Sequence, residues 1–500
     1  MTRIVLETPR VGAHLAEFSW TVQPPATLYK KTSFYLRFPD DVDISSLPAA
    51  LWWRVFLICL HPHWAVLRPC EVHLPITLPA GEKEFWRRLV AAYSMTLDIV
   101  PNRNRERPPE GGVTIIEDGS PLAMPDALPD LNRYGTAFSG GKDSLLQTGL
   151  LSELTDKPLL VTTTSPMPPL HDHLTARRRW IFSEIVQRRK VRWLEVKSDF
   201  RSSWDNAYPG GYEMATNELT DVHLYFAALL VVGAALGVTH LCVAAEAEVH
   251  ENARLDGRII QHQHFMYSSI TQRALSAVLR SMGFQYCSLT SPLHAAQVQQ
   301  LLWTRYPNIR DLQYSCWKVG LNEKQCSRCP SCLQMALCAL AMGMNPEVMG
   351  INLVTLFNRM SDWSPQEAST DPRRRLVPNY VVKTRWEGYN VRHMLAITPQ
   401  QLRDAISESG RMRMAHPATW LALRRFARMR ERMAKYPVPA APGYWPAFLR
   451  LVDQSLRKKI GAIYAEAFVA EQESAYLGVL ERSDELVSWI TAPIGGEGPR

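Results

Sequence analysis

The sequence predicts an α/β protein built on a doubly wound parallel sheet, with an N-terminal α+β domain and a C-terminal helical domain. From residue 133 onward, short apolar runs alternate with helical patterns, as in such sheets. One of the first runs passes through a glycine pair straight into a helix. Segments rich in Pro, Gly or Arg at 101–112 and 121–129 predict a linker and a boundary near residue 130. The expected parts are 1–128, 129–348 and 349–500.

The composition is that of an ordinary globular protein. The chain has 500 residues, more than one core usually supports, and 46% of them are hydrophobic. A net charge of +8, from 56 basic and 48 acidic residues, suits nucleotide phosphates as well as RNA. Charges within the first ten residues argue against a secretory signal, so a cytoplasmic location is expected. Gly237 divides the longest apolar stretch, 224–245, into a helix and a short strand, so no membrane span is expected.

The first part, residues 1–128, mixes strand and helix patterns. Strands are expected at 33–38 and 72–77, and apolar helices at 47–60 and 82–93. These elements predict an α+β module, and they carry no functional motif.

The central part, residues 129–348, contains the alternating pattern. The expected strands are 134–138, 159–163, 192–196 and 239–244, and the expected helices are 145–154, 177–189 and 219–236. Ligands bind at the carboxyl ends of parallel strands, so polar residues that follow the strands should converge on one crevice. These residues are Ser139, Thr163, Thr164, Ser198, Glu246 and Glu248.

The most specific signal is the run Ser139-Gly140-Gly141-Lys142-Asp143-Ser144 between a predicted strand and a predicted helix. Two glycines permit a sharp turn with bare backbone N–H groups, and the helix presents its positive end to an anion. The run lacks the spacing of a Walker A loop. It therefore predicts a phosphate-binding loop, with a plain glycine turn as the alternative.

Four cysteines, Cys316, Cys326, Cys329 and Cys332, are separated by nine, two and two residues. Four thiolates at this spacing can close a tetrahedral Zn²⁺ site, for which a structural role is expected. An iron–sulfur cluster is the main alternative, since similar spacings occur in ferredoxins. Disulfides are not expected in a cytoplasmic chain.

The last part, residues 349–500, is mainly helical and is expected to form a separate domain. The expected helices are 398–409, 416–435, 445–468 and 474–490.

The glycine loop followed by the four cysteines resembles the 7-cyano-7-deazaguanine synthase family of PP-loop ATP pyrophosphatases. The run Thr290-Ser-Pro-Leu293 and the run Tyr314-Ser-Cys316 are also similar to that family's pattern. The resemblance covers residues 133–345 and leaves both flanks unexplained. It implies the fold of the adenine nucleotide alpha hydrolases, with ATP, Mg²⁺ and Zn²⁺ as cofactors.

The resemblance also implies a chemistry. Such enzymes adenylate a 7-deazaguanine carboxylate, and a nitrogen nucleophile then displaces AMP. Residues Ser139, Gly140, Gly141, Asp143 and Ser144 would hold the pyrophosphate, with Asp143 orienting Mg²⁺. Lys142 would neutralise charge on the phosphates, and the four cysteines would carry zinc. Thr163 and Thr164 are further candidates for the nucleotide site.

The chain departs from the family where the substrate should bind. The family's Arg-Asn element and its Tyr-Pro-Asp-Cys-Arg run are missing, and the runs 246–252 and 261–267 stand in that region. Glu246, Glu248, His262 and His264 are therefore the candidates for binding or deprotonating an incoming amine. Longer proteins similar to this synthase occur in bacterial anti-phage defence operons. This context favours a partner protein as the acceptor, docked by the flanking domains.

Three other functions remain open at this point. The first is free synthesis of 7-cyano-7-deazaguanine. The second is tRNA thiolation, which is compatible with the loop, the cysteines and the basic runs at 177–179, 188–190, 373–375 and 424–432. The third is a non-catalytic nucleotide sensor, which the intact loop disfavours.

Overall fold

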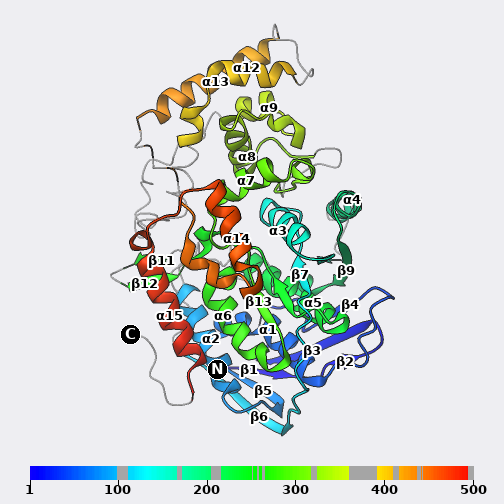
Figure 1. Ribbon diagram of the computed structural model, residues 1–500. Helices are drawn as coiled ribbons and strands as arrows, with labels where there is room; N and C mark the ends of the chain where they lie inside the picture. The colour runs from blue at the N-terminus through cyan, green and yellow to red at the C-terminus, as the bar shows by residue number, and fades with distance from the viewer. Residues whose placement is uncertain are drawn as a thin grey trace.

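The structure is a computed structural model, shown as a ribbon in Figure 1. It describes residues 1–26, 28–97, 111–165, 172–203, 215–250, 252–255, 258–261, 265–316, 324–359, 391–408, 416–435, 438, 441 and 443–493. Most of the linker expected at 101–112 lies outside these residues.

Five parallel strands form one end of the sheet. They are β7 (Tyr134–Ala137), β8 (Leu159–Thr164), β9 (Arg192–Ser198), β10 (His240–Cys242) and β13 (Gln285–Cys287). Their order is β13-β10-β7-β8-β9, and each neighbouring pair is parallel. The chain starts in the middle at β7, builds one side and then the other, so the order reverses between β7 and β10. The α/β class is confirmed, and the crevice at this reversal is where such sheets bind ligands.

The N-terminal strands continue the same sheet. β4 (Ser33–Arg37) pairs antiparallel with β9, and beyond it come β3 (Leu15–Gln23), β1 (Thr2–Leu6), β5 (Cys70–Thr77) and β6 (Val113–Pro121). The short β2 (Arg10–Val11) pairs with β3. The expected strands at 33–38 and 72–77 are confirmed. The sheet runs across the boundary expected near residue 130.

Helices cover both faces of the sheet. On one face lie α1 (Ala49–Leu67), α2 (Glu82–Leu97), α5 (Ala215–Leu236) and α6 (Ser269–Leu279). On the other lie α3 (Lys142–Leu154), α4 (Asp172–Arg188) and α7 (Ala295–Arg305). Strand β8 shows the division, because Leu159 and Val161 pack into the first core and Leu160 into the second.

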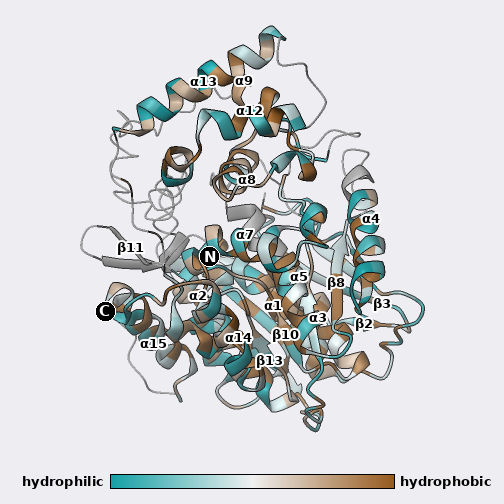
Figure 2. Cartoon of the chain, turned by 45° about the horizontal axis from the view of Figure 1, so that its top comes forward, coloured by the Kyte–Doolittle hydropathy of each residue, from teal (hydrophilic) through white to brown (hydrophobic). Residues whose placement is uncertain are grey.

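Helix α1 is long and apolar enough to cross a membrane, but its whole apolar window is buried inside the protein. Figure 2 shows α1 among other hydrophobic elements of the interior. It is a core helix that packs against α2 and α5. The stretch 224–245 contains the later part of α5, which ends at Leu236, then a left-handed Gly237 with φ of 66°, and then β10, as expected.

The residues after 349 divide between two places, unlike the single helical domain expected. Helices α9 (Leu353–Arg359), α12 (Pro399–Glu408) and α13 (Pro417–Met433) pack together at one end of the molecule (Figure 1). Of these, α9 and α12 also contact the earlier helix α8 (Pro330–Ala341). Helix α14 (Gln454–Ala467) returns to α3, and α15 (Leu477–Thr491) lies against α2 and α6. The short helix before α14 ends at Leu451, and Asp453 caps the start of α14, so the helix expected at 445–468 is split.

Smaller elements complete the described fold. β11 (Asn252–Leu255) and β12 (Arg258–Gln261) form a separate hairpin. The 3-10 helices are η1 (Phe200–Ser203), η2 (Ala247–His250), η3 (Phe265–Tyr267), η4 (Arg280–Met282), η5 (Arg310–Leu312), η6 (Pro346–Met349), η7 (Pro446–Leu451) and η8 (Glu473–Ala475).

Candidate functional site

The loop Ser139–Ser144 leads from β7 into α3 at the reversal point of the sheet. Gly140 has φ of +83°, and a Cβ there would lie 3.3 Å from Ile181 Cδ1. Gly141 has φ of −72° and caps α3 without any side-chain hydrogen bond. Gly140 is therefore required by the turn, whereas Gly141 keeps the start of the helix uncovered.

Hydroxyl groups within the loop fix its shape. Ser144 Oγ accepts the N–H of Gly140 at 3.1 Å, and Ser139 Oγ accepts that of Gly141 at 3.4 Å. The N–H groups in the first turn of α3 have no partner inside the helix, because helical bonding starts one turn later. The loop thus presents donors at the positive end of a helix, as a phosphate site requires.

Lys142 lies between two carboxylates. Its Nζ donates to Asp143 Oδ1 at 2.8 Å and to Glu246 Oε2 at 2.5 Å, and its side chain is 13% exposed. Burial would lower the pKa of Lys142, but the two carboxylates outweigh burial and raise it. Burial raises the pKa of Glu246, with Lys142 opposing the rise and Asp143 adding to it. Lys142 is therefore charged, and its ammonium group is bound by the side chains of Asp143 and Glu246.

Glu248, the second predicted glutamate, is bound within the fold. Both of its carboxylate oxygens lie 3.0 Å from the N–H of Ala295 at the start of α7, and Oε1 lies 3.3 Å from His294 Nδ1. Burial would raise the pKa of Glu248, but His294 and the Ala295 N–H lower it overall. This carboxylate stabilises the N-terminus of α7 at the edge of the site.

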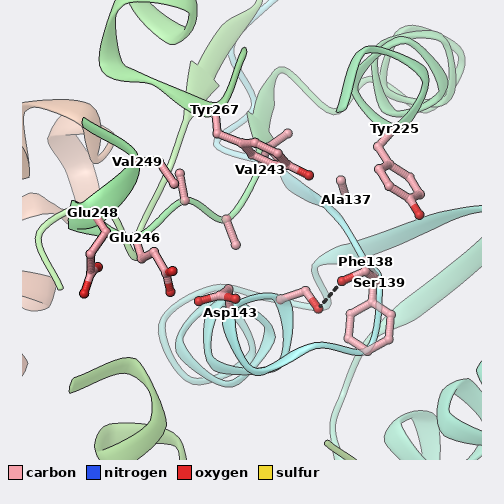
Figure 3. Close-up of a pocket in the computed structure, with 13 residues that line it drawn as sticks. Ala137, Phe138, Ser139, Asp143, Tyr225, Val243, Glu246, Glu248, Val249 and Tyr267 are labelled. Carbon is pink, nitrogen blue, oxygen red and sulfur yellow. Dashed lines mark hydrogen bonds between the residues drawn. The ribbon is translucent and has the colours of Figure 1, made fainter. Parts of the chain in front are cut away.

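Two cavities flank the loop. The first, called the acidic cavity here, is about 230 Å³ and is lined by residues that include Ser139, Asp143, Glu246, Glu248, Tyr225 and Tyr267. Figure 3 shows Glu246 and Glu248 on the segment after β10, beside Asp143, with both tyrosines across the cavity. The second, the basic cavity, is about 240 Å³ and is lined by residues that include Gly141, Lys142, Arg178, Tyr314, Cys316 and Ser331. Ser139 and Asp143 line both.

Arg178 is a site residue that the sequence interpretation missed. It is 7% exposed, donates to the Thr163 carbonyl at 3.2 Å and lies 3.4 Å from the Tyr225 hydroxyl, while its Nε has no partner. The neighbouring Arg179 pairs instead with Glu195, and Arg177 lies over the Trp180 ring. The three arginines of the run 177–179 thus lie in three different environments. Only the position of Arg178 beside the end of β8 could have indicated that it belongs to a site.

The other predicted strand-end residues lie outside both cavities. Thr163 is 1% exposed with no partner for its hydroxyl, and the hydroxyl of Thr164 donates to Glu195 at 2.7 Å. Ser198 Oγ accepts the N–H of Phe200 at 3.2 Å. The predicted His262 and His264 lie outside the described residues.

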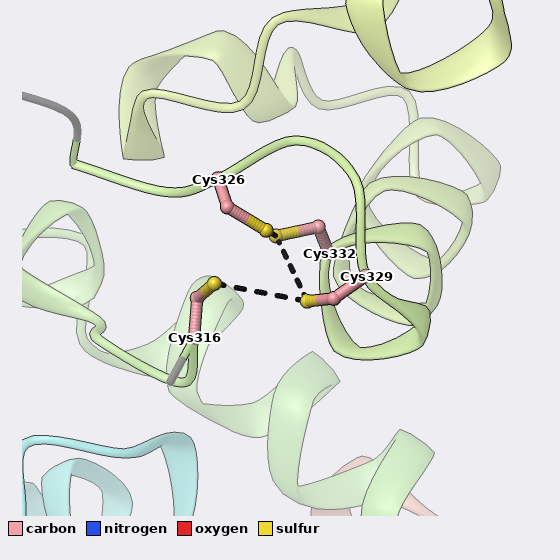
Figure 4. Close-up of side chains that lie close together, drawn as sticks. All are labelled: Cys316, Cys326, Cys329 and Cys332. Carbon is pink, nitrogen blue, oxygen red and sulfur yellow. Dashed lines mark hydrogen bonds between the residues drawn. The ribbon is translucent and has the colours of Figure 1, made fainter. Parts of the chain in front are cut away.

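The four predicted cysteines meet in one buried cluster (Figure 4). Their sulfur atoms all lie within 4.8 Å of one another, with Cys316–Cys329 at 3.7 Å, Cys326–Cys332 at 3.8 Å and Cys329–Cys332 at 3.5 Å. Zinc–sulfur bonds of about 2.3 Å in a tetrahedron separate sulfurs by about 3.8 Å. The cluster could therefore hold a single zinc ion.

The cluster is joined to the loop. The N–H of Tyr314, two residues before Cys316, donates to the Gly140 carbonyl at 2.7 Å. Cys329 caps α8, and Ser331 in the first turn of that helix lines the basic cavity. A metal that binds all four thiolates would hold both segments beside the loop.

Comparison of the chain with protein-family models, curated proteins and solved structures finds no match. The side chains themselves carry the functional inference. Open N–H groups at a helix start, with Lys142 and Arg178 beside them, can hold a polyphosphate. Carboxylates on the opposite side can hold a cation or a hydrogen-bond donor next to it.

Proposed function

We propose that this chain is a cytoplasmic PP-loop ligase that uses ATP to join a 7-deazaguanine carboxylate to a nitrogen nucleophile. The observation that carries the proposal is the loop Ser139–Ser144, which lies at the reversal point of the sheet between the basic cavity and the acidic cavity. The resemblance to 7-cyano-7-deazaguanine synthases supplies the acid.

The loop and its neighbours would act first on ATP. The N–H groups of α3 and Lys142 would hold the phosphates, and Asp143 would bind the accompanying Mg²⁺, which would neutralise phosphate charge. A carboxylate oxygen of the acid attacks the α-phosphorus, and pyrophosphate leaves. The nitrogen then bonds to the acyl carbon, the bond from that carbon to the AMP oxygen breaks, and the nitrogen gives up a proton.

The acceptor proposed is an amine on a partner protein of anti-phage defence. Support comes from the missing substrate motifs of the family and from the large flanking regions. With ammonia as the nucleophile, the same steps would give an amide on the way to free 7-cyano-7-deazaguanine.

To test the proposal, the purified chain is incubated with ATP and 7-carboxy-7-deazaguanine, with ammonium or with proteins encoded beside it. Release of AMP and a mass shift in the acid or a protein are expected. Glu153→Gln removes one charge from the far end of α3, where Glu153 pairs with Arg305, and serves as the control for loss of a charge away from the site. If neither AMP nor a mass shift appears, the proposal is wrong.

A second candidate is a tRNA-thiolating enzyme of the PP-loop type. One surface favours it: α13 exposes Arg424, Arg428 and Arg432 one turn apart, with Trp420 56% exposed at its start. The run 188–190 does not favour it, because Arg188 pairs with Asp311 and Lys190 with Asp156. Metal analysis separates the candidates, since iron would favour thiolation and zinc the ligase.

A further inference from the structure

The two cavities beside the loop differ in charge, and one ion pair connects them. Lys142 lines the basic cavity, and Glu246 lines the acidic cavity. The lysine Nζ reaches across the start of α3 to the glutamate at 2.5 Å. In this structure, therefore, the cation that a phosphate would need is bound to the carboxylate of the opposite cavity.

Glu246 depends on Lys142 more than its neighbour Glu248 does. Glu248 is 1% exposed and bound by the Ala295 N–H and His294, so it is satisfied without the lysine. Within the described part of the chain, Lys142 is the cation that pairs with Glu246. If the lysine moved away, Glu246 would be left as a carboxylate at the wall of a cavity, 23% exposed and without a counter-ion.

A nucleotide would compete for the same lysine. Phosphate oxygens bound at the N–H groups of α3 would lie beside Lys142, which is the first residue of that helix. Arg178 also lines the basic cavity, has an unpartnered Nε, and would strengthen the attraction for phosphate. Asp143, the other partner of Lys142, lines the basic cavity as well, so the lysine can keep that contact. A pyrophosphate group carries more negative charge than the Glu246 carboxylate, so the lysine should transfer from Glu246 to the phosphates.

We propose that the Lys142–Glu246 ion pair is a latch that ATP opens, and that the released Glu246 carboxylate then binds the protonated amine of the acceptor and takes a proton from it, which leaves the nitrogen free to attack. The inference rests on the proposed function and adds an order to it, with nucleotide before amine. A carboxylate that loses one ammonium group is suited to bind another. A neutral alcohol would not replace the lost charge.

The latch has a consequence for equilibrium binding. Because the ion pair must break before phosphate binds, its removal should tighten phosphate binding. Glu246→Gln keeps the size of the side chain and removes its charge. We expect inorganic pyrophosphate to bind roughly tenfold more tightly to this variant, a ratio that corresponds to about 1.4 kcal/mol. Glu153→Gln removes the same charge from the far end of α3 and should leave the affinity unchanged.

The second expected result concerns the amine. Methylammonium should bind the native chain more tightly when pyrophosphate is saturating, and pyrophosphate should gain by the same factor from methylammonium. Glu246→Gln should abolish this coupling. Both affinities are measured by titration calorimetry, with thermal unfolding to show that each variant is folded.

The outcomes distinguish failure of the latch from failure of the proposed function. If the native chain binds pyrophosphate but Glu246→Gln binds it equally or more weakly, the latch is wrong and the glutamate supports the phosphate site instead. Absence of coupling in the native chain also overturns it. If the native chain and both variants fail to bind pyrophosphate, the phosphate loop itself is wrong, and the proposed function falls with it.

Discussion

The cysteine cluster and the phosphate loop are joined by one hydrogen bond, yet their polar groups are used in opposite ways. The four thiols point at one another and are buried, so together they can supply all four ligands of one ion. The loop directs its backbone donors, Lys142 and Asp143 toward cavities. From this difference we infer a structural role for the cluster and a ligand-binding role for the loop.

The largest effect should come from opening the cluster. Cys326→Ser removes one of four thiolates, and we expect the free energy of unfolding to fall by at least about 3 kcal/mol, since a structural zinc contributes on the order of 10 kcal/mol in isolated peptides. Denaturant unfolding and metal content by mass spectrometry measure it. Cys59→Ala, a buried cysteine of α1 outside the cluster, should cost about 1 kcal/mol and keep the metal. Unchanged metal content in Cys326→Ser would contradict the zinc site.

At the loop we expect the opposite result, a large loss of activity with little change in stability. Asp143→Asn keeps the ion pair of Lys142 with Glu246 but removes a charge that both cavities share. ATP–pyrophosphate exchange should fall about 100-fold, while unfolding should change by no more than about 0.5 kcal/mol. Exchange that persists in the variant would show that the carboxylate is not part of the chemistry. Loss of stability instead would make the loop structural, like the cluster.

Within the loop, Gly140 should matter for stability and Gly141 for phosphate binding. Gly140→Ala places a side chain at φ of +83° and should cost about 1–2 kcal/mol of stability. Gly141→Ala has an ordinary φ of −72° and no contact closer than 3.5 Å, so stability should hold. Its methyl group would instead enter the basic cavity and weaken pyrophosphate binding. Unfolding and titration calorimetry of both variants check this, and equal losses of stability would contradict it.

At the opposite end of the same strands, a modest effect on stability is expected with no effect on phosphate binding. Asp453 Oδ1 accepts the Tyr134 hydroxyl at 2.7 Å, and Oδ2 lies 3.1 Å from His240 Nε2. Burial would raise the pKa of Asp453, but hydrogen bonds from His240, Ser455 and Tyr134 lower it overall. Its stabilisation is therefore present above the unfolded pKa of about 3.9 and is lost as the pH falls further.

Asp453→Asn measures that contribution. At pH 7 the variant should lose about 1–2 kcal/mol of stability, and the difference from the native chain should shrink below pH 4. A difference that stays constant from pH 7 to pH 3 would mean that the charge of Asp453 contributes nothing. Exchange of pyrophosphate should be unaffected, because the residue lines neither cavity.

The sequence predicts the local parts of the site well. The order of an apolar run, two glycines and a helix pattern is enough to place Ser139–Ser144 between β7 and α3. Four cysteines at close spacing are enough to predict a cluster that the fold does assemble. Both signals are contained within short segments, where backbone geometry and ligand chemistry leave few alternatives.

Contacts between distant segments could not be predicted in this way. Tyr134 and Asp453 are 319 positions apart, and nothing in either segment indicates the other. Arg178 reads as one member of a surface-like basic run, and its burial becomes visible only when α4 packs beside β8. The role of Glu248 at the start of α7 likewise depends on a helix 47 positions later in the chain.

The pairing of β4 with β9 also limits how the chain can be divided in the laboratory. A fragment starting near residue 129 would expose the hydrogen-bonding edge of β9, which β4 covers in the intact chain. An uncovered edge strand invites pairing between molecules. Such a fragment should precipitate even though it carries the loop and the cysteines, and limited proteolysis at the 101–112 segment should leave two pieces that remain associated.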